Sequence, residues 1–236
     1  ILSEKIFSLS HLDKSGELTP AVEVNDGVDY VPAKRGVLFG HHFSSIAGAA
    51  PIVGPAVAAI WGWLPAFLWI VFGVVFMGAA HDFGVLVLSL KHGGKSIAEV
   101  SENFLGKKGK NLFLIVIFFL VWMVIAVFAL VIANLFISFP SSVIPVNFEI
   151  FIALVIGFIV RKTNISLTIP SLLAQAMLML MIYIGTIYPI SLSEYVGAEN
   201  TLMAWMIFLL IYSFIASILP VWVLLQPRDY INCHQL

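Results

Sequence analysis

Long apolar stretches recur along this chain, and they constrain its fold more than any other feature. A helix needs roughly 20 apolar residues to cross the hydrocarbon core of a bilayer. Lipid offers no hydrogen-bond partners to a bare backbone, so we expect each stretch to be helical. Six stretches meet the length requirement, near 37–60, 64–90, 111–138, 144–160, 166–188 and 202–225. The sequence therefore predicts an all-α polytopic membrane protein with six transmembrane helices.

Composition supports a lipid environment. Hydrophobic residues make up 61% of the 236 residues and charged residues only 11%, against about a quarter in soluble domains. The net charge of −1 argues against a nucleic-acid partner. The single cysteine, Cys233, excludes an internal disulfide and a thiolate metal site, and we expect no cofactor. The sequence starts at Ile1 rather than Met, and we interpret it as a fragment whose remaining spans lie elsewhere.

The cations predict an orientation. With six crossings, every lysine and arginine falls on the same side of the membrane. They are Lys5, Lys14, Lys34, Arg35, Lys91, Lys95, Lys107, Lys108, Lys110, Arg161, Lys162 and Arg228. The opposite loops carry none. Because cytoplasmic loops gather Lys and Arg, we expect a cytoplasmic segment over 1–35, a transmembrane region over 36–225, and the start of a cytoplasmic loop over 226–236.

A short amphipathic helix is predicted near 95–106, on the cytoplasmic surface. Ser96 and Glu99 have the spacing of a capping box at its start, and Gly106 provides a stop. Apolar residues between them recur at helical spacing, which is typical of a helix lying on a membrane surface.

The first span contains residues that weaken a helix. Gly40, Ser44 and Gly48 recur every four residues, and His41 and Ser45 lie one step round. Downstream stand Pro51, Gly54 and Pro55. One interpretation is close helix packing through small residues, with prolines that only kink the span. The other, which we favour because packing needs no paired histidines and serines, is a discontinuous helix whose exposed backbone binds a solute or ion.

Asp82 is the acidic residue of the second span. It stands nine residues before Lys91, or about 13 Å along a helix, which places it inside the hydrocarbon. A charged, unpaired carboxylate there costs at least ~2.5–3.5 kcal/mol. Asp82 is therefore either a structural partner of His81, His41 or another helix, or a group that loads and releases a proton. His41 and His42 point about 100° apart on a helix, so we do not expect them to form a metal site.

The sixth span repeats the pattern from the other side of the membrane. Four residues interrupt it, namely Tyr212, Ser213, Ser217 and Pro220. Two interrupted, antiparallel helices five spans apart are typical of a transporter built from inverted repeats. Ser171 and Gln175 in the fifth span are lesser candidates, and we expect them to form hydrogen bonds between helices.

Three blocks of the sequence carry a resemblance that covers nearly the whole chain: "NDGVDYVPAKRGVLFGHHFSSIAGAAPIVGPAVAA" (25–59), "HDFGVLVLSLKHGGKSIAEV" (81–100) and "QPRDYIN" (226–232). They resemble the carbon starvation protein A family of bacterial inner-membrane carriers. The resemblance implies uptake of peptides or pyruvate with protons, as a response to carbon starvation. It also implies the fold of amino acid–polyamine–organocation carriers, two inverted five-helix repeats with broken first helices. The first five spans would then form one repeat and the sixth would begin the next.

We therefore expect a carrier with a small-molecule substrate and H⁺ as the coupling ion. Its substrate site would comprise Ser44, Ser45 and the backbone from Gly48 to Gly54, with the prolines at 51 and 55. Asp82 would carry the proton, assisted by His41 or His42. Two alternatives remain open, namely a membrane enzyme that uses these three residues and a membrane sensor or scaffold without transport.

The "QPRDY" segment is expected to form a turn after the sixth span. Arg228 and Asp229 follow Pro227 there, and an arginine at such a place can hydrogen-bond the last carbonyls of a helix. A cytoplasmic gate is the second interpretation of this segment.

Overall fold

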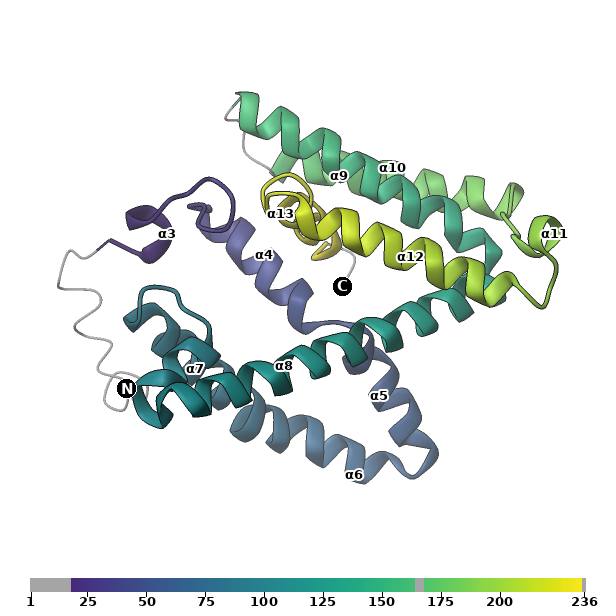
Figure 1. Ribbon diagram of the computed structural model, residues 1–236. Coiled ribbons are helices and arrows are strands. Elements are labelled where there is room, and N and C mark those ends of the chain that lie inside the picture. Colours follow the sequence, from purple (N-terminus) through teal and green to yellow (C-terminus); the bar gives the residue numbers. More distant parts are fainter. Residues whose placement is uncertain (1–17, 164–167, 235–236) are drawn as a thin grey trace. The chain divides into compact units, whose positions relative to one another are not determined.

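The computed structural model describes residues 18–163 and 168–234, and in these ranges it contains helices and no strand (Figure 1). Residues 1–17 of the expected cytoplasmic segment lie outside the described residues. The helices are α3 (Pro20–Glu23), α4 (Arg35–Ile46), α5 (Ala49–Ile60), α6 (Trp63–Leu68), η1 (Trp69–Ala79, a π-helix), α7 (Ala80–Lys91), α8 (Ile97–Ser138), η2 (Pro140–Ser142, a 3₁₀-helix), α9 (Val143–Thr163), α10 (Thr168–Ile187), α11 (Ser193–Val196), α12 (Thr201–Ile218) and α13 (Leu225–Asn232).

The chain divides into two compact units. One consists of the residues up to Pro32 together with 50–120, and the other consists of 33–49 together with 121–236. One boundary falls at the start of α5 and the other within α8, so the second unit contains α4, the C-terminal part of α8, and all helices from α9 to α13.

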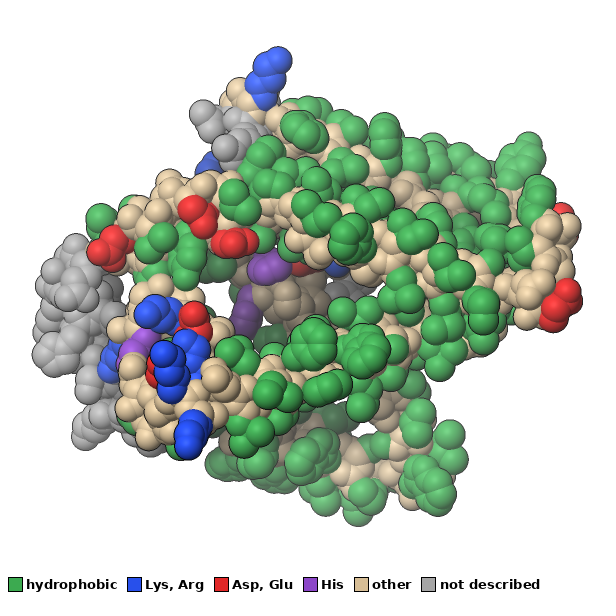
Figure 2. Space-filling view, in the orientation of Figure 1, with side chains coloured by type: hydrophobic (Ala, Val, Ile, Leu, Met, Phe, Trp, Pro, Cys, Tyr) green, Lys and Arg blue, Asp and Glu red, His purple; other side chains and the backbone are tan. Residues whose placement is uncertain are grey.

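Five helical segments among the described residues are long and apolar enough to cross a membrane. They are Trp63–Lys91, Ile97–Ser138, Pro140–Val160, Thr168–Ile187 and Thr201–Ile218. Hydrophobic side chains cover the visible face of α10 and α12, where a soluble protein would carry polar groups (Figure 2). These features describe a multi-pass membrane protein.

The first expected span, 37–60, is interrupted. Its helices α4 and α5 have 12 residues each, which is too short for either to cross the hydrocarbon alone. The break lies at Ala47, whose φ and ψ are −78° and 53°, and at Gly48, whose amide donates to the carbonyl of Ile46. It therefore precedes both prolines. Pro51 falls in the first turn of α5, where an amide has no partner within the helix, and α5 continues through Pro55.

Helix α8 contains a second interruption, at Gly106. The residue has φ 69° and ψ 177°, a conformation that glycine adopts without the strain of a Cβ atom. The amphipathic segment thus runs from Ile97 to the residue before Gly106, where the sequence placed its end. At its start the amide of Glu99 donates to Ser96 Oγ over 3.4 Å, half of a capping box.

The sixth span differs from its expected form. Helix α12 is continuous through Tyr212, Ser213 and Ser217 and ends at Ile218, so only Pro220 lies in the interruption. The turn expected over 226–230 is instead part of the helix α13. A proline at its third residue is compatible with a helix because the first amides of a helix lack internal partners.

Helix α13 is integrated into the core of the second unit. It packs against α4, α9 and α10. A cluster of buried apolar residues joins it to α9 and α10, comprising Ile152, Ala153, Ile156, Ala174, Leu178, Leu224 and Ile231. A second cluster joins α8, α9 and α12 through Ala129, Ala133, Phe136, Val143, Trp205 and Leu209. Burial of the apolar side chains of the first cluster is the main favourable contribution to the free energy that holds α13 in place.

Candidate functional site

Helices α4 and α13 approach each other closely because α4 presents small residues to its neighbour. A Cβ atom on Gly40 would lie 2.8 Å from Cδ2 of Tyr230 and 3.4 Å from its Cα. Gly40 is buried, and Ser44 one turn later also faces α13. Of the small residues that recur every four positions, Gly40 and Ser44 are therefore used for close helix packing. At the other end, a Cβ on Gly48 would meet Phe128 Cζ at 3.7 Å, an ordinary contact.

Asp229 connects α4 to α13. His41 Nδ1 lies 2.6 Å from Asp229 Oδ2, and the Ser44 hydroxyl donates to the backbone oxygen of Asp229 over 2.7 Å. Arg228 Nη2 donates to the other carboxylate oxygen, Oδ1, over 3.3 Å. The Asp229 side chain is only 8% exposed. Both of its oxygens thus have a polar partner, as a buried carboxylate requires.

Arg228 connects α13 to α12. Its Nη1 donates to the Tyr212 hydroxyl over 3.1 Å, and its Nε is buried with no hydrogen-bond partner among the described residues. The sequence predicted that Arg228 would bond the last carbonyls of the preceding helix. That expectation is wrong in its geometry, because α13 is a helix and directs the guanidinium to side chains instead.

Glu149 on α9 completes this group, and sequence reasoning missed it. Its Oε1 is buried without a hydrogen-bond partner in the described part of the chain. The α13 residues Arg228, Asp229 and Asn232 lie close enough to act on it electrostatically. A signal was available, because Glu149 is the single charged residue between positions 144 and 160. We call Glu149, Arg228, Asp229 and His41 the α9–α13 cluster.

Ser171 and Gln175 line α10 near the end of α13. Ser171 is fully buried, and its hydroxyl donates to the Thr168 carbonyl over 2.9 Å and lies 3.1 Å from His234 Nε2. The Oε1 atom of Gln175 is buried and has no hydrogen-bond partner among the residues described. Ser171 therefore bonds within its own helix and to the turn that follows α13 rather than to another helix, and Gln175 leaves an acceptor free.

The remaining predicted substrate residues are distributed between the two units. Ser45 donates to the His41 carbonyl over 2.8 Å, so its hydroxyl, like that of Ser44, is bonded to backbone. Gly54 has open space where a Cβ atom would stand, and Pro51 and Pro55 lie in the helical part of α5. Ser213 and Ser217 donate to carbonyls of their own helix, α12. The helix interruption is limited to Ala47 and Gly48 and does not extend to Gly54.

Asp82 lies on α7, in the other unit. Its Oδ1 is 3.2 Å from Nδ1 of the adjacent His81, and the two side chains are 50% and 73% exposed. His42 is exposed on α4. Of the three predicted proton-handling residues, only His41 is placed by the structure against a buried carboxylate, and that carboxylate is Asp229.

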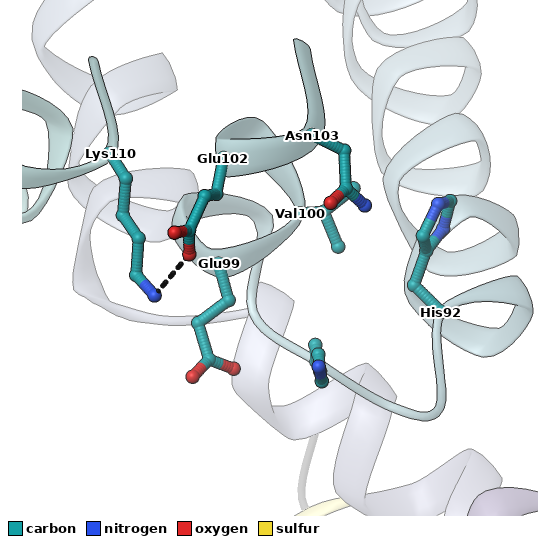
Figure 3. Close-up of a pocket in the computed structure, with 7 residues that line it drawn as sticks. His92, Glu99, Val100, Glu102, Asn103 and Lys110 are labelled. Carbon is teal, nitrogen blue, oxygen red and sulfur yellow. Dashed lines mark hydrogen bonds and ion pairs between the residues drawn. The ribbon is translucent and has the colours of Figure 1, made fainter. Parts of the chain in front are cut away.

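A small polar pocket lies where α7 meets the start of α8, with a volume of about 140 Å³. Figure 3 shows Lys110 directed at Glu102, whose Oε2 accepts from Nζ over 2.7 Å, with His92 on the opposite side. The lining residues are His92, Lys95, Glu99, Val100, Glu102, Asn103 and Lys110. Opposite charges balance within it, and Figure 2 shows blue and red side chains gathered around the start of α8. In the described ranges, no three His, Cys, Asp or Glu side chains gather as metal ligands.

Comparison with known proteins finds a matching family and relatives that are named transporters. The family described as carbon starvation protein CstA matches residues 2–236. A relative named peptide transporter CstA, from Campylobacter jejuni, is 38% identical over 229 residues, which cover 96% of this chain and 32% of the relative. The pyruvate/proton symporter BtsT of Escherichia coli is 39% identical over 216 residues, covering 90% of this chain and 30% of the symporter.

The peptide transporter CstA of Bacillus subtilis is 37% identical over 215 residues, covering 91% of this chain and 36% of the relative. This chain thus spans about a third of the length of the relatives it matches. No solved structure matches it.

Proposed function

This chain belongs to the carbon starvation protein CstA family, and on that premise we propose that it acts as a secondary active transporter that takes up small nutrients together with protons. The substrates proposed are peptides or pyruvate, taken up when carbon is scarce. The names of the relatives support this, since one is a peptide transporter and another a pyruvate/proton symporter. No enzymatic activity is proposed.

One observation carries the proposal, namely the interrupted helix at Ala47 and Gly48 beside a cluster of charged side chains. A transporter needs a place where backbone groups and ionisable side chains meet a solute inside the membrane. Helix α4 ends at such a break, and within the two turns before it His41 and Ser44 contact Asp229. A chain that only packed helices together would have no need of this arrangement.

Within this proposal, Ser44, Ser45 and the backbone that begins at Gly48 form part of the substrate site, with Pro51, Gly54 and Pro55 shaping α5 beyond it. Asp82 carries the coupling proton, assisted by His41 or His42. The break around Pro220 is the counterpart on the sixth span, with Tyr212, Ser213 and Ser217 on the helix before it.

Pro227, Arg228 and Asp229 are proposed to hold α13 to α4 and to act as a gate. The contact from Asp229 to His41 supports this role, because a gate needs a bond between elements that can separate.

The proposed topology has six crossings, with α4 and α5 together forming the first. The protein would lie in the bacterial inner membrane with residues 1–35 in the cytoplasm. The six spans would comprise one inverted repeat and the first span of the next. Support comes from the five long apolar segments and from the one-sided distribution of the Lys and Arg residues other than Arg228, which belongs to the α9–α13 cluster.

A flux measurement tests the proposal. The purified protein is reconstituted into proteoliposomes, and uptake of labelled pyruvate and of labelled dialanine is followed with the vesicle interior more alkaline than the outside. We expect accumulation of at least one substrate, and we expect a protonophore to abolish it. Equal levels with and without the pH gradient for both substrates would refute the proposal.

A further inference from the structure

Glu149 is the buried ionisable group that the proposed roles above leave unused. It stands nine residues after Pro140 and eleven before Val160, so it lies near the middle of a segment able to cross the membrane. The atom Oε1 is enclosed by protein and receives no hydrogen bond from any residue described. An ionised carboxylate in such a place keeps an unsatisfied acceptor and loses the hydration it would have in water, and both effects cost free energy.

The groups that face Glu149 come mainly from α13. Arg228, Asp229 and the polar side chain of Asn232 lie close enough to act on its carboxyl group electrostatically. Helices α10 and η2 also pack on α9, and α8 and α12 meet it in the second apolar cluster. Helices α10, η2 and α12 contain two titratable side chains, Tyr183 and Tyr212, and no charged one. The residues that α8 brings to that cluster, Ala129, Ala133 and Phe136, are apolar. Arg228 is therefore the cation available to Glu149.

Arg228 already has other partners, however. Its Nη2 donates to Asp229 and its Nη1 to Tyr212, while Asp229 also holds His41 through its second oxygen. The negative charge of Asp229 is thus balanced by the positive charge of Arg228. Two carboxylates against one guanidinium leave the α9–α13 cluster with a surplus negative charge when His41 is neutral. A surplus charge at membrane depth is expensive, and one bound proton removes it.

We infer that Glu149 is a proton-binding site, and that the α9–α13 cluster holds one exchangeable proton on the Glu149 carboxyl. The proton comes from the aqueous phase, binds Oε1, and turns the carboxylate into a neutral acid that no longer needs a cation. This inference rests on the proposed carrier function, because it names a residue that couples protons to transport. It adds a site in the second unit to the proposed role of Asp82 in the first.

The arrangement of Arg228 indicates how binding of this proton affects Asp229 and helix α4. Loss of the proton creates a second carboxylate that competes with Asp229 for the guanidinium, whose Nε has no hydrogen-bond partner in the described part of the chain. Any movement of Arg228 toward Glu149 weakens its bond to Asp229. Asp229 is hydrogen-bonded to His41 and Ser44. A change in the protonation of Glu149 on α9 therefore reaches the interrupted helix α4 through α13.

The test compares Glu149→Gln with Glu194→Gln, a matched change at an exposed carboxylate after α10. In proteoliposomes with an imposed pH gradient, we expect Glu149→Gln to reduce pyruvate or dialanine accumulation at least tenfold. We expect it to retain exchange of internal for external substrate, which requires no net proton release. Glu194→Gln behaves as wild type in both assays. Gradient-driven accumulation by Glu149→Gln at the wild-type level would overturn the inference.

Infrared spectroscopy of the purified protein provides a readout that does not depend on transport. At neutral pH we expect the absorption of a protonated carboxyl group in the wild type and in Glu194→Gln, and its loss in Glu149→Gln. Absence of this absorption from the wild type would overturn the proton site whatever the flux results. If the absorption is present but the wild type transports neither substrate, the site stands and the proposed function fails.

Discussion

His41 Nδ1 lies 2.6 Å from Asp229 Oδ2, although 188 positions separate the two residues in the chain. One stands before the interruption of the first span and the other in the short helix after the sixth. The contact joins two segments that the sequence alone assigned to separate regions, a transmembrane helix and a loop. In a carrier, such a bond has to form and break for α4 and α13 to separate.

Replacing Asp229 with asparagine tests how much this bond stabilises the second unit. Asp229→Asn removes the charge that Arg228 and His41 face, while the partly buried guanidinium keeps its bond to the Tyr212 hydroxyl. A hydrogen bond to a charged group contributes about 1.5–3 kcal/mol, so we expect a loss of that order in the free energy of unfolding. The measurement is thermal unfolding of the protein in detergent. The exposed Asp29→Asn is the control, and equal stability of the two variants would contradict the assignment.

Close packing of α4 on α13 predicts opposite effects for two glycines of one helix. A Cβ atom at Gly40 would stand 2.8 Å from the Tyr230 ring, so Gly40→Ala forces the helices apart and costs about 1–3 kcal/mol. At Gly36 the nearest atom is the Tyr230 hydroxyl at 3.8 Å, so Gly36→Ala fits and gains up to about 1 kcal/mol from helix propensity. Unfolding temperatures of the two variants provide the check. A Gly40→Ala protein as stable as Gly36→Ala would show that the helices do not pack this closely.

A pH dependence is expected in the loop before α4. Asp26 Oδ1 accepts hydrogen bonds from the amides of Val28, Asp29 and Tyr30 at 2.8–2.9 Å. These bonds hold the pKa of Asp26 below its ordinary value of 3.8, and the bond from Val28 has the largest effect. A lowered pKa in the folded state means that the stabilisation is complete above the ordinary pKa and is lost as the pH falls through the lowered one.

Hydrogen–deuterium exchange over this loop measures that effect. At neutral pH we expect faster exchange of these amides in Asp26→Ala than in the wild type. Comparison at the same pH cancels the intrinsic change in exchange rate, and the difference should vanish as Asp26 becomes protonated. A difference that persists unchanged into acid would show that the carboxylate does not hold the loop.

The proposed role of Asp82 predicts a loss of energy coupling rather than a loss of folding. We expect Asp82→Asn to abolish accumulation against a gradient, because an amide cannot load and release a proton, while the protein still inserts into the membrane. The measurements are pH-driven uptake in proteoliposomes and the amount of protein in the membrane fraction, with Asp29→Asn as control. Undiminished gradient-driven uptake would remove Asp82 from this role and leave Glu149 as the candidate.

Six crossings predict which positions a membrane-impermeant thiol reagent reaches from outside the cell. In a Cys233→Ser background, we expect labelling of Glu199→Cys and protection of Lys108→Cys. Protection of Ala33→Cys tests the interrupted first span, because residue 33 lies inside only if α4 and α5 together cross the membrane. External labelling of Ala33→Cys would show that they do not.

Apolar length and the distribution of charge were enough to predict the helical membrane fold, because both are properties of local sequence. Five of the six predicted spans coincide with long helices in the structure. The crossing by the first span, 37–60, remains a prediction. The breaks were harder to place. Prolines at 51 and 55 suggested a break from 48 to 54, yet a proline in the first turn of a helix removes no internal bond, and α5 starts before both.

The α9–α13 cluster escaped sequence reasoning for a different reason. The notable feature of Glu149 is its isolation in an apolar span, and its partners come from a segment almost 80 residues away. Helix α13 has only eight residues, and "QPRDY" contains the signals of a turn as well as those of a helix start. Tertiary packing against α4, α9 and α10 decides between these two outcomes, and it cannot be read from local sequence.

Gly157 on α9 shows what that packing requires. A Cβ atom there would stand 2.5 Å from the carbonyl oxygen of Val223 and 3.1 Å from that of Trp222. The connection between α12 and α13 therefore rests directly on the α9 backbone, in a space that any side chain would fill. The hydrogen atom that glycine has in place of a methyl group therefore decides whether the connection closes over α9 or is held away from it. The position of this connection also decides whether Arg228 comes near Glu149.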